Sequence, residues 1–252
     1  MIVILVLGLL FTLFSGTVRL PAFTTAPDGT RLRVFTVNSA GDQVPATIER
    51  NKFLNAQNLA QLAKDTSFTA IMAVGMAFVI ISGGIDLSVG AIYALASVVG
   101  ALVLHRYGPT GAMADTAPWL GTLLGVGACL AVSVLCGLLN GGLTVALRVH
   151  PFIITLGTMA ILRGVAFVAT NGQSIFGFPA PLREVIRSGV DNGMSVAPLT
   201  VMVAVAVAGS LYLSRLAAGR RIYAVGGNEQ AARFSGINLN RVKLGVYIVS
   251  GL

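Results

Sequence analysis

The sequence predicts an all-α integral membrane protein, built as a polytopic bundle of transmembrane helices. Of its 252 residues, 55% are hydrophobic and only 10% are charged, whereas soluble domains carry roughly 25% charged residues. The mean hydropathy is +0.84, and several apolar runs reach the roughly 20 residues that cross a bilayer. The net charge of +8 would suggest nucleic-acid binding in a soluble protein. Here it is interpreted by position, because Lys and Arg gather in cytoplasmic loops.

Seven apolar runs are separated by more polar stretches, so we expect about seven helices in this part of the chain. The runs lie near residues 1–15, 66–82, 85–104, 119–147, 151–170, 197–214 and 243–252. The first is interpreted as a transmembrane helix and not as a signal peptide, because no basic segment precedes it. The last is too short to span a bilayer, so we expect further helices to follow it and the domain to be incomplete at its C-terminal end.

The longest polar stretch, 16–65, contains prolines and alternating charges and is expected to be a loop with one short helix near its end. The orientation of the chain in the membrane follows from 215–243, which contains six basic residues and a single acidic residue, Glu229. This excess places 215–243 in the cytoplasm. Counting helices back then places 16–65 outside the membrane, although it carries six Lys and Arg, because long loops translocate largely regardless of charge.

Small residues recur every four positions along the apolar run 119–147. They are Gly121, Gly125, Cys129, Ser133, Gly137 and Gly141. Such a ridge lets the backbone of a neighbouring helix approach closely. It serves either static packing or a helix that slides during transport, and in both cases we expect this helix at the centre of the bundle.

The sequence patterns of several chemistries are absent. His105 and His150 are far apart and have no cysteine or carboxylate ligands in a metal-binding spacing around them. The chain contains neither a G-x-x-x-x-G-K-[ST] loop for ATP nor a G-x-S-x-G nucleophile motif. We therefore expect no enzymatic activity, metal or cofactor.

The segment Ser82–Gly90, with the sequence SGGIDLSVG, interrupts two apolar runs. Its glycines allow a sharp break in the backbone. Asp86 or Ser88 can then accept the free N–H groups at the start of the next helix. The alternative is a broken helix whose Asp86 carboxylate lines a polar pathway, since charges inside a membrane are costly and usually functional.

A second motif begins with Asn140 and continues as a helix from Pro151, which suits a first helical position. Thr155 and Thr158 are three residues apart and share a face of this helix. Arg163 lies about 18 Å along it from its start. These three residues either line a solute pathway or make hydrogen bonds between helices, with Arg163 snorkelling towards the interface.

The third motif lies in the basic loop, at GRRIYAVGGNEQAARFSGI over residues 219–237. A short helix over about 228–235 is predicted, with Asn228 as its cap, Glu229 in its first turn and Gly236 at its end. Ala231 and Ala232 are small enough for a partner to pack closely. The alternative is an ordinary basic loop that touches lipid head groups.

These motifs resemble the permease subunit of bacterial ABC importers of the ribose/xylose/galactose type. The resemblance rests on GGIDLSVGA at 83–91, on LNGG and PFIITLGTMAILRG within 139–164, and on 219–238. It implies an inner-membrane subunit with about ten helices in its full form. It also implies pairing with a second permease, two ATPases docking from the cytoplasm, and delivery of a sugar by a periplasmic binding protein.

By the same resemblance, the loop within 215–243 holds the helix that couples the permease to the ATPase. The matching positions are Gly226, Gly227, Asn228, Glu229, Ala231, Ala232, Gly236 and Ile237. The candidate translocation path consists of Asp86, Ser88, Asn140, Thr155, Thr158 and Arg163. The outside loop 16–65 departs from the family by an apparent insertion around 24–50.

Two other function classes are compatible with the composition. A secondary transporter or facilitator would use Asp86 at a broken helix to couple ion and solute movement. A structural or scaffolding membrane protein would leave the three motifs unexplained.

Overall fold

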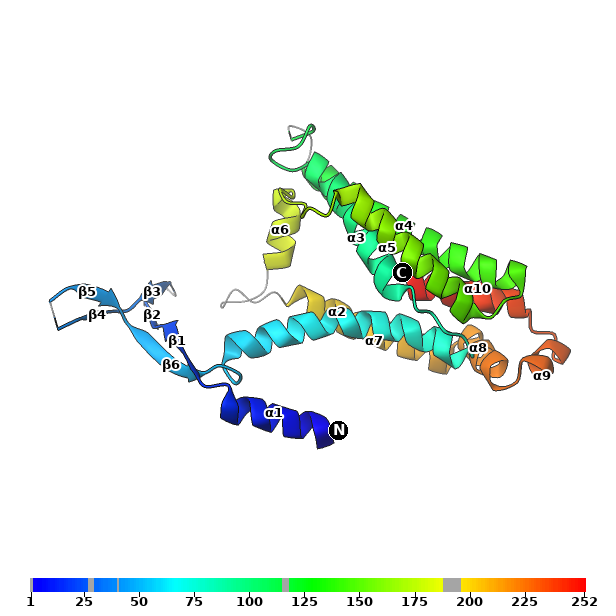
Figure 1. Cartoon of the computed structure of the whole chain (residues 1–252), viewed down its shortest axis with the longest axis horizontal. Coiled ribbons are helices and arrows are strands. Elements are labelled where there is room, and N and C mark those ends of the chain that lie inside the picture. Colours follow the sequence, from blue (N-terminus) through cyan, green and yellow to red (C-terminus); the bar gives the residue numbers. More distant parts are fainter. Residues whose placement is uncertain (1, 27–29, 40, 115–117, 188–195) are drawn as a thin grey trace. The chain divides into compact units, whose positions relative to one another are not determined.

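The computed structural model describes residues 2–26, 30–39, 41–114, 118–187 and 196–252. Within these residues, five helices are long and apolar enough to cross a membrane, so the predicted polytopic helical fold is confirmed. In order, they are α2 (Ala56–Ile81), α3 (Val89–Arg106), α4 (Pro118–Leu147), α5 (Pro151–Thr170) and α7 (Ala197–Arg215). The shorter helices are α1 (Ile2–Phe14), α6 (Ala180–Arg187), α8 (Ala217–Gly227), α9 (Glu229–Phe234) and α10 (Leu239–Gly251). All are labelled in Figure 1.

The chain forms two compact units, Met1–Ala63 and Lys64–Leu252. The first contains α1 and three antiparallel ribbons, where a loop was expected. The ribbons pair β1 (Thr17–Pro21) with β6 (Thr47–Asn51), β2 (Phe23–Thr25) with β3 (Arg31–Arg33), and β4 (Phe35–Val37) with β5 (Gln43–Pro45). They meet where Ala22, Val34 and Ala46 exchange backbone hydrogen bonds in a ring. The short helix expected around residues 55–64 is instead the beginning of the continuous α2.

In the second unit, α3, α4, α5 and α10 pack against one another (Figure 1). Buried apolar side chains of α3, α4 and α5 form one cluster: Ala91, Ile92, Leu95, Cys136, Leu162 and Ala166. A second cluster joins α2, α8 and α10 through Phe78, Val79, Ile222, Val246 and Tyr247. Beside it, α7 contacts α2, and the rings of Phe78 and Tyr212 lie 5.5 Å apart.

The ridge of small residues on α4 provides close contact with two helices, as the sequence predicted. A Cβ atom at Gly125 would collide with the Leu104 side chain of α3, and one at Gly137 would collide with the Tyr247 carbonyl oxygen of α10. The opposite face of α4 is uncovered in this chain, with Leu123 68% and Leu135 63% exposed. The ridge therefore marks one packed face of α4, and this helix contacts α3, α5, α6 and α10, in keeping with the central place expected for it in the bundle.

Replacing Gly137 with alanine is expected to destabilise the protein by about 1–3 kcal/mol, because the new methyl group must push α10 away from α4. The matched control is Gly127→Ala on the same helix, where a Cβ atom meets nothing within 4 Å. That control should be neutral or slightly stabilising, since alanine favours a helix by up to about 1 kcal/mol over glycine. Thermal unfolding in detergent compares the two, and equal stability would contradict the backbone contact.

Candidate functional site

The turn between α2 and α3 carries a buried carboxylate. Asp86 is only 1% exposed. Its Oδ1 atom accepts hydrogen bonds from the backbone N–H of Ser88 at 2.9 Å and from the Ser88 hydroxyl at 2.6 Å. Asp86 thus binds the N–H group of Ser88, the residue that precedes α3, whereas the Ser88 side chain makes no capping hydrogen bond to the helix, so the capping interpretation is not borne out. Gly83 supplies the sharp turn with a φ of +79°.

Hydrogen bonds join this turn to two distant helices. The Asn140 Nδ2 group of α4 donates to Ser88 Oγ at 2.7 Å. From α10, the Ser250 hydroxyl donates to Asp86 Oδ2 at 3.2 Å, and the Tyr247 hydroxyl donates to the Ile85 carbonyl at 3.1 Å. The turn is therefore part of a buried polar network that includes α3, α4 and α10, and it contains three of the predicted path residues.

Two polar atoms next to this network remain unpaired among the described residues. They are Asn140 Oδ1 and Thr144 Oγ1, which lie one turn apart on α4. Buried polar atoms usually have a protein or water partner, so these two are available to a bound polar molecule. Ser250 of the network also lines a cavity of about 480 Å³ between α2, α3, α4, α7 and α10. The cavity is mainly apolar, but Tyr93, Ser97 and Ser133 add hydroxyl groups to it.

The remaining predicted path residues are not hydrogen-bonded to this network. Thr155 and Thr158 share the buried face of α5, as predicted. Their hydroxyls, however, donate to carbonyl groups of α5 itself, those of Pro151 and Thr155. Arg163 is exposed and lies off this buried face. Their role in a passage stays a prediction.

The basic loop forms α8 and then the short helix α9, close to the predicted limits. The Asn228 side chain caps α9 by accepting the Ala231 N–H at 2.9 Å. Gly236 follows the helix with a φ of +80°. At the end of α8, Gly226 lies so close to the turn after α2 that a Cβ atom would collide with the Ile81 carbonyl oxygen. The first and third motifs therefore meet backbone to backbone.

One side of α9 is strongly exposed. Phe234, at its end, is 90% exposed, whereas Ala232 is buried. Glu229, in its first turn, pairs with Lys243 of α10, with 2.8 Å between Oε1 and Nζ. A six-residue helix held at its base and carrying an exposed aromatic side chain is suited to binding another protein.

Four residues of this arrangement were not singled out from the sequence: Phe234, Lys243, Tyr247 and Ser250. The last three recur at positions i, i+4 and i+7 of α10, which places them on one helical face. This spacing was a usable signal within a run that otherwise looked uniformly apolar. Phe234 had no comparable signal, because exposure cannot be inferred from one aromatic residue.

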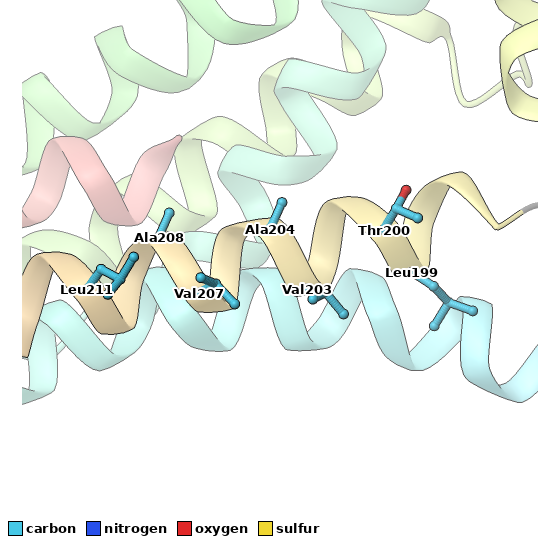
Figure 2. Close-up of a pocket in the computed structure, with 7 residues that line it drawn as sticks. All are labelled: Leu199, Thr200, Val203, Ala204, Val207, Ala208 and Leu211. Carbon is cyan, nitrogen blue, oxygen red and sulfur yellow. The ribbon is translucent and has the colours of Figure 1, made fainter.

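A second hollow, of about 600 Å³, lies along the exposed face of α7 (Figure 2). Every residue that lines it belongs to α7: Leu199, Thr200, Val203, Ala204, Val207, Ala208 and Leu211. The only side-chain polar group among them, the Thr200 hydroxyl, donates to the Ala197 carbonyl of the same helix. This surface suits contact with lipid or another helix, because a solute would find only this one hydroxyl on it.

Comparison with known proteins gives consistent results. The family profile described as "Branched-chain amino acid transport system / permease component" matches residues 58–252. The ribose import permease protein RbsC of Escherichia coli K12 is 37% identical over 83% of this chain and 62% of its own length. The D-allose transport system permease protein AlsC of the same strain is 36% identical over 79% and 57%, respectively.

The xylose transport system permease protein XylH, also from Escherichia coli K12, is 31% identical over 79% of this chain and 63% of its own length. The chain thus spans less than two thirds of the length of these curated relatives. No solved structure matches it.

Proposed function

The chain belongs to the family of branched-chain amino acid transport system permease components, and from this premise we propose that it is the membrane-spanning permease subunit of an ATP-binding-cassette importer for a monosaccharide. It performs no bond chemistry. A separate ATPase hydrolyses ATP, and a periplasmic binding protein delivers the sugar. A second permease subunit completes the passage in the inner membrane.

The observation that carries this proposal is the geometry of α9. This short helix is capped by Asn228, is closed by Gly236, and leaves Phe234 exposed for a partner. We assign residues 226–237 as the segment that binds the ATPase. A movement of this segment can be transmitted directly to the membrane helices, because Gly226 contacts the end of α2.

The proposed orientation places α9 and the turn between α2 and α3 on the cytoplasmic side. The six basic residues of 215–243 support this side for α9. Counting helices back from α9 assigns the α2–α3 turn to the same side. The contact between Gly226 and Ile81 is consistent with both assignments, because segments that touch in this way must lie at the same membrane surface.

The proposed substrate is a monosaccharide, by analogy with the ribose, allose and xylose named for the relatives. A sugar passage needs hydroxyl-compatible groups that bind only weakly. The unpaired atoms of Asn140 and Thr144 and the hydroxyls at the cavity between α2, α3, α4, α7 and α10 supply such groups. Asp86 is occupied by hydrogen bonds from Ser88 and Ser250, so no observation favours ion coupling through it.

The test is purification of the full-length protein from native membranes in mild detergent, followed by transport in liposomes. We expect a stoichiometric ATPase with its own phosphate-binding loop to copurify. We also expect sugar uptake to require ATP and the binding protein, and to persist when an uncoupler collapses the ion gradients. A protein that purifies without an ATPase and transports without ATP would refute the proposal.

A further inference from the structure

Helix α10 connects the two regions that the proposed function uses. Lys243, Tyr247 and Ser250 occupy positions i, i+4 and i+7, so they share one face of the helix. Lys243 pairs with α9, and the other two bond to the turn between α2 and α3. At a rise of 1.5 Å per residue, Lys243 and Ser250 are about 10 Å apart along the axis.

An ion pair links α9 to the nearer end of α10. Lys243 Nζ lies 2.8 Å from Glu229 Oε1, and the two side chains are 29% and 53% exposed. The Phe234 side chain is directed into solvent and adds little packing at this end of α9. An ion pair with this exposure contributes little to the stability of a fold. Its removal should therefore leave the protein folded, which allows any effect on transport to be measured separately.

The other end of α10 is linked by buried hydrogen bonds. Tyr247 is 1% exposed and donates to the Ile85 carbonyl, while Ser250 donates to the neighbouring Asp86 carboxylate. Two consecutive residues of the α2–α3 turn are thus bound to α10. Asp86 in turn binds Ser88, at the start of α3, so α10 and α3 share one carboxylate.

Along its length and at its last residue, α10 rests directly on the backbone of α4. A Cβ atom at Gly141 would lie 3.1 Å from Leu244 Cα, and one at Gly251 would lie 2.6 Å from the Ser133 carbonyl oxygen. Few flexible side chains separate the two helices at these points. Packed interiors transmit displacement with little compression, so a shift of one end of α10 must appear at the other.

We propose that Lys243 is a positioning residue for transport, which carries movement of α9 through α10 to the α2–α3 turn at Asp86. The proposal rests on the proposed function, in which α9 binds the ATPase. It assigns Lys243 no contact with sugar or ATPase. Its ion pair with Glu229 makes α9 and α10 move together.

The experiment uses the full-length protein with its ATPase and binding protein in liposomes, and measures sugar molecules imported per ATP hydrolysed. For Lys243→Glu we expect normal copurification of the ATPase and retained ATP hydrolysis, but at least a tenfold lower import per ATP. Lys243→Arg should behave as the unmodified protein.

Arg241→Glu is the matched control, since it makes the same charge change two residues away, at an exposed position of α10. It should leave import per ATP unchanged. Unchanged coupling in Lys243→Glu, or an equal loss in Lys243→Arg, would overturn the proposal. So would loss of the ATPase from Lys243→Glu alone, which would make Lys243 a docking residue. If no ATPase copurifies with the unmodified protein, the proposed function itself is refuted.

Discussion

A protein carrying Phe234→Asp is expected to lose its ATPase during purification while its transmembrane helices remain folded. Phe234 is 90% exposed at the end of α9, so the substitution disturbs no packing within the chain. Aromatic residues are enriched at protein interfaces, and the few anchor residues of an interface each contribute about 2 kcal/mol or more. Loss of such an anchor, with a charge in its place, weakens binding by at least about 30-fold.

The measurement is the ATPase-to-permease ratio after affinity purification, together with titration of purified ATPase onto the permease. Phe176→Asp is the matched control, because Phe176 is 74% exposed in the segment that follows α5. The helix count assigns that segment to the opposite membrane side, so this control should retain the ATPase. Equal ATPase binding by both variants would contradict docking at α9. It would favour the alternative in which the basic loop rests on lipid head groups.

The prediction of α9 from the sequence succeeded because its determinants are local. Asn228, Glu229 and Gly236 lie within nine residues of one another, and each acts on the nearest turn of the helix. The partner of Glu229 is 14 residues away on another helix. The residues around α9 do not show which basic residue of the loop will pair with Glu229. The helix was therefore predictable, and its attachment to α10 was not.

The buried polar network was also predictable only in its local contacts, and not in those that join residues far apart in the sequence. The sequence predicted that Asp86 or Ser88 would accept the N–H groups that begin α3, whereas Asp86 binds the Ser88 N–H, two residues away and just before the helix. Its bond to Ser250 joins residues 164 positions apart. Serine occurs in many membrane helices, and a single sequence does not show which serine will hydrogen-bond to a particular carboxylate. The contact depends on how α10 packs against α4.

Helical geometry explains why Arg163 does not share a face with Thr155 and Thr158. Eight residues separate Thr155 from Arg163, which is about 2.2 turns at 3.6 residues per turn, so their directions differ by about 80°. The threonines themselves were placed correctly on a common face. Their hydroxyls bond to carbonyl groups of the preceding turn, a local option that threonine often uses inside helices.

The ribbons within 16–65 were missed because their strands are only three to five residues long. Alternation of apolar and polar residues is a reliable strand signal over roughly four to eight residues. Here prolines at positions 21 and 45 fall at strand ends and favoured a loop interpretation. Hydrogen bonds among Ala22, Val34 and Ala46 hold the ribbons together. They join backbone atoms, so the side chains at these positions do not indicate them.

The second large effect is expected at Asp86. Asp86→Ala removes the acceptor of three buried donors, namely the Ser88 N–H, the Ser88 hydroxyl and the Ser250 hydroxyl. Hydrogen bonds to a charged group contribute about 1.5–3 kcal/mol each, and unsatisfied buried donors are costly. We therefore expect a loss of about 3 kcal/mol or more in stability, seen as a lower unfolding temperature in detergent and poor recovery from membranes.

Asp86→Asn separates the hydrogen-bonding role of this residue from its charge. An asparagine oxygen can still accept from Ser88, and its amide can donate to the Ser250 oxygen, so most of the network survives. We expect a loss of only about 1 kcal/mol and ATP-driven uptake close to that of the unmodified protein. An Asp86→Asn protein that is folded and retains its ATPase, yet transports nothing, would show that the charge itself is required. Such a result would contradict a structural role for the carboxylate and would support ion-coupled transport through a broken helix.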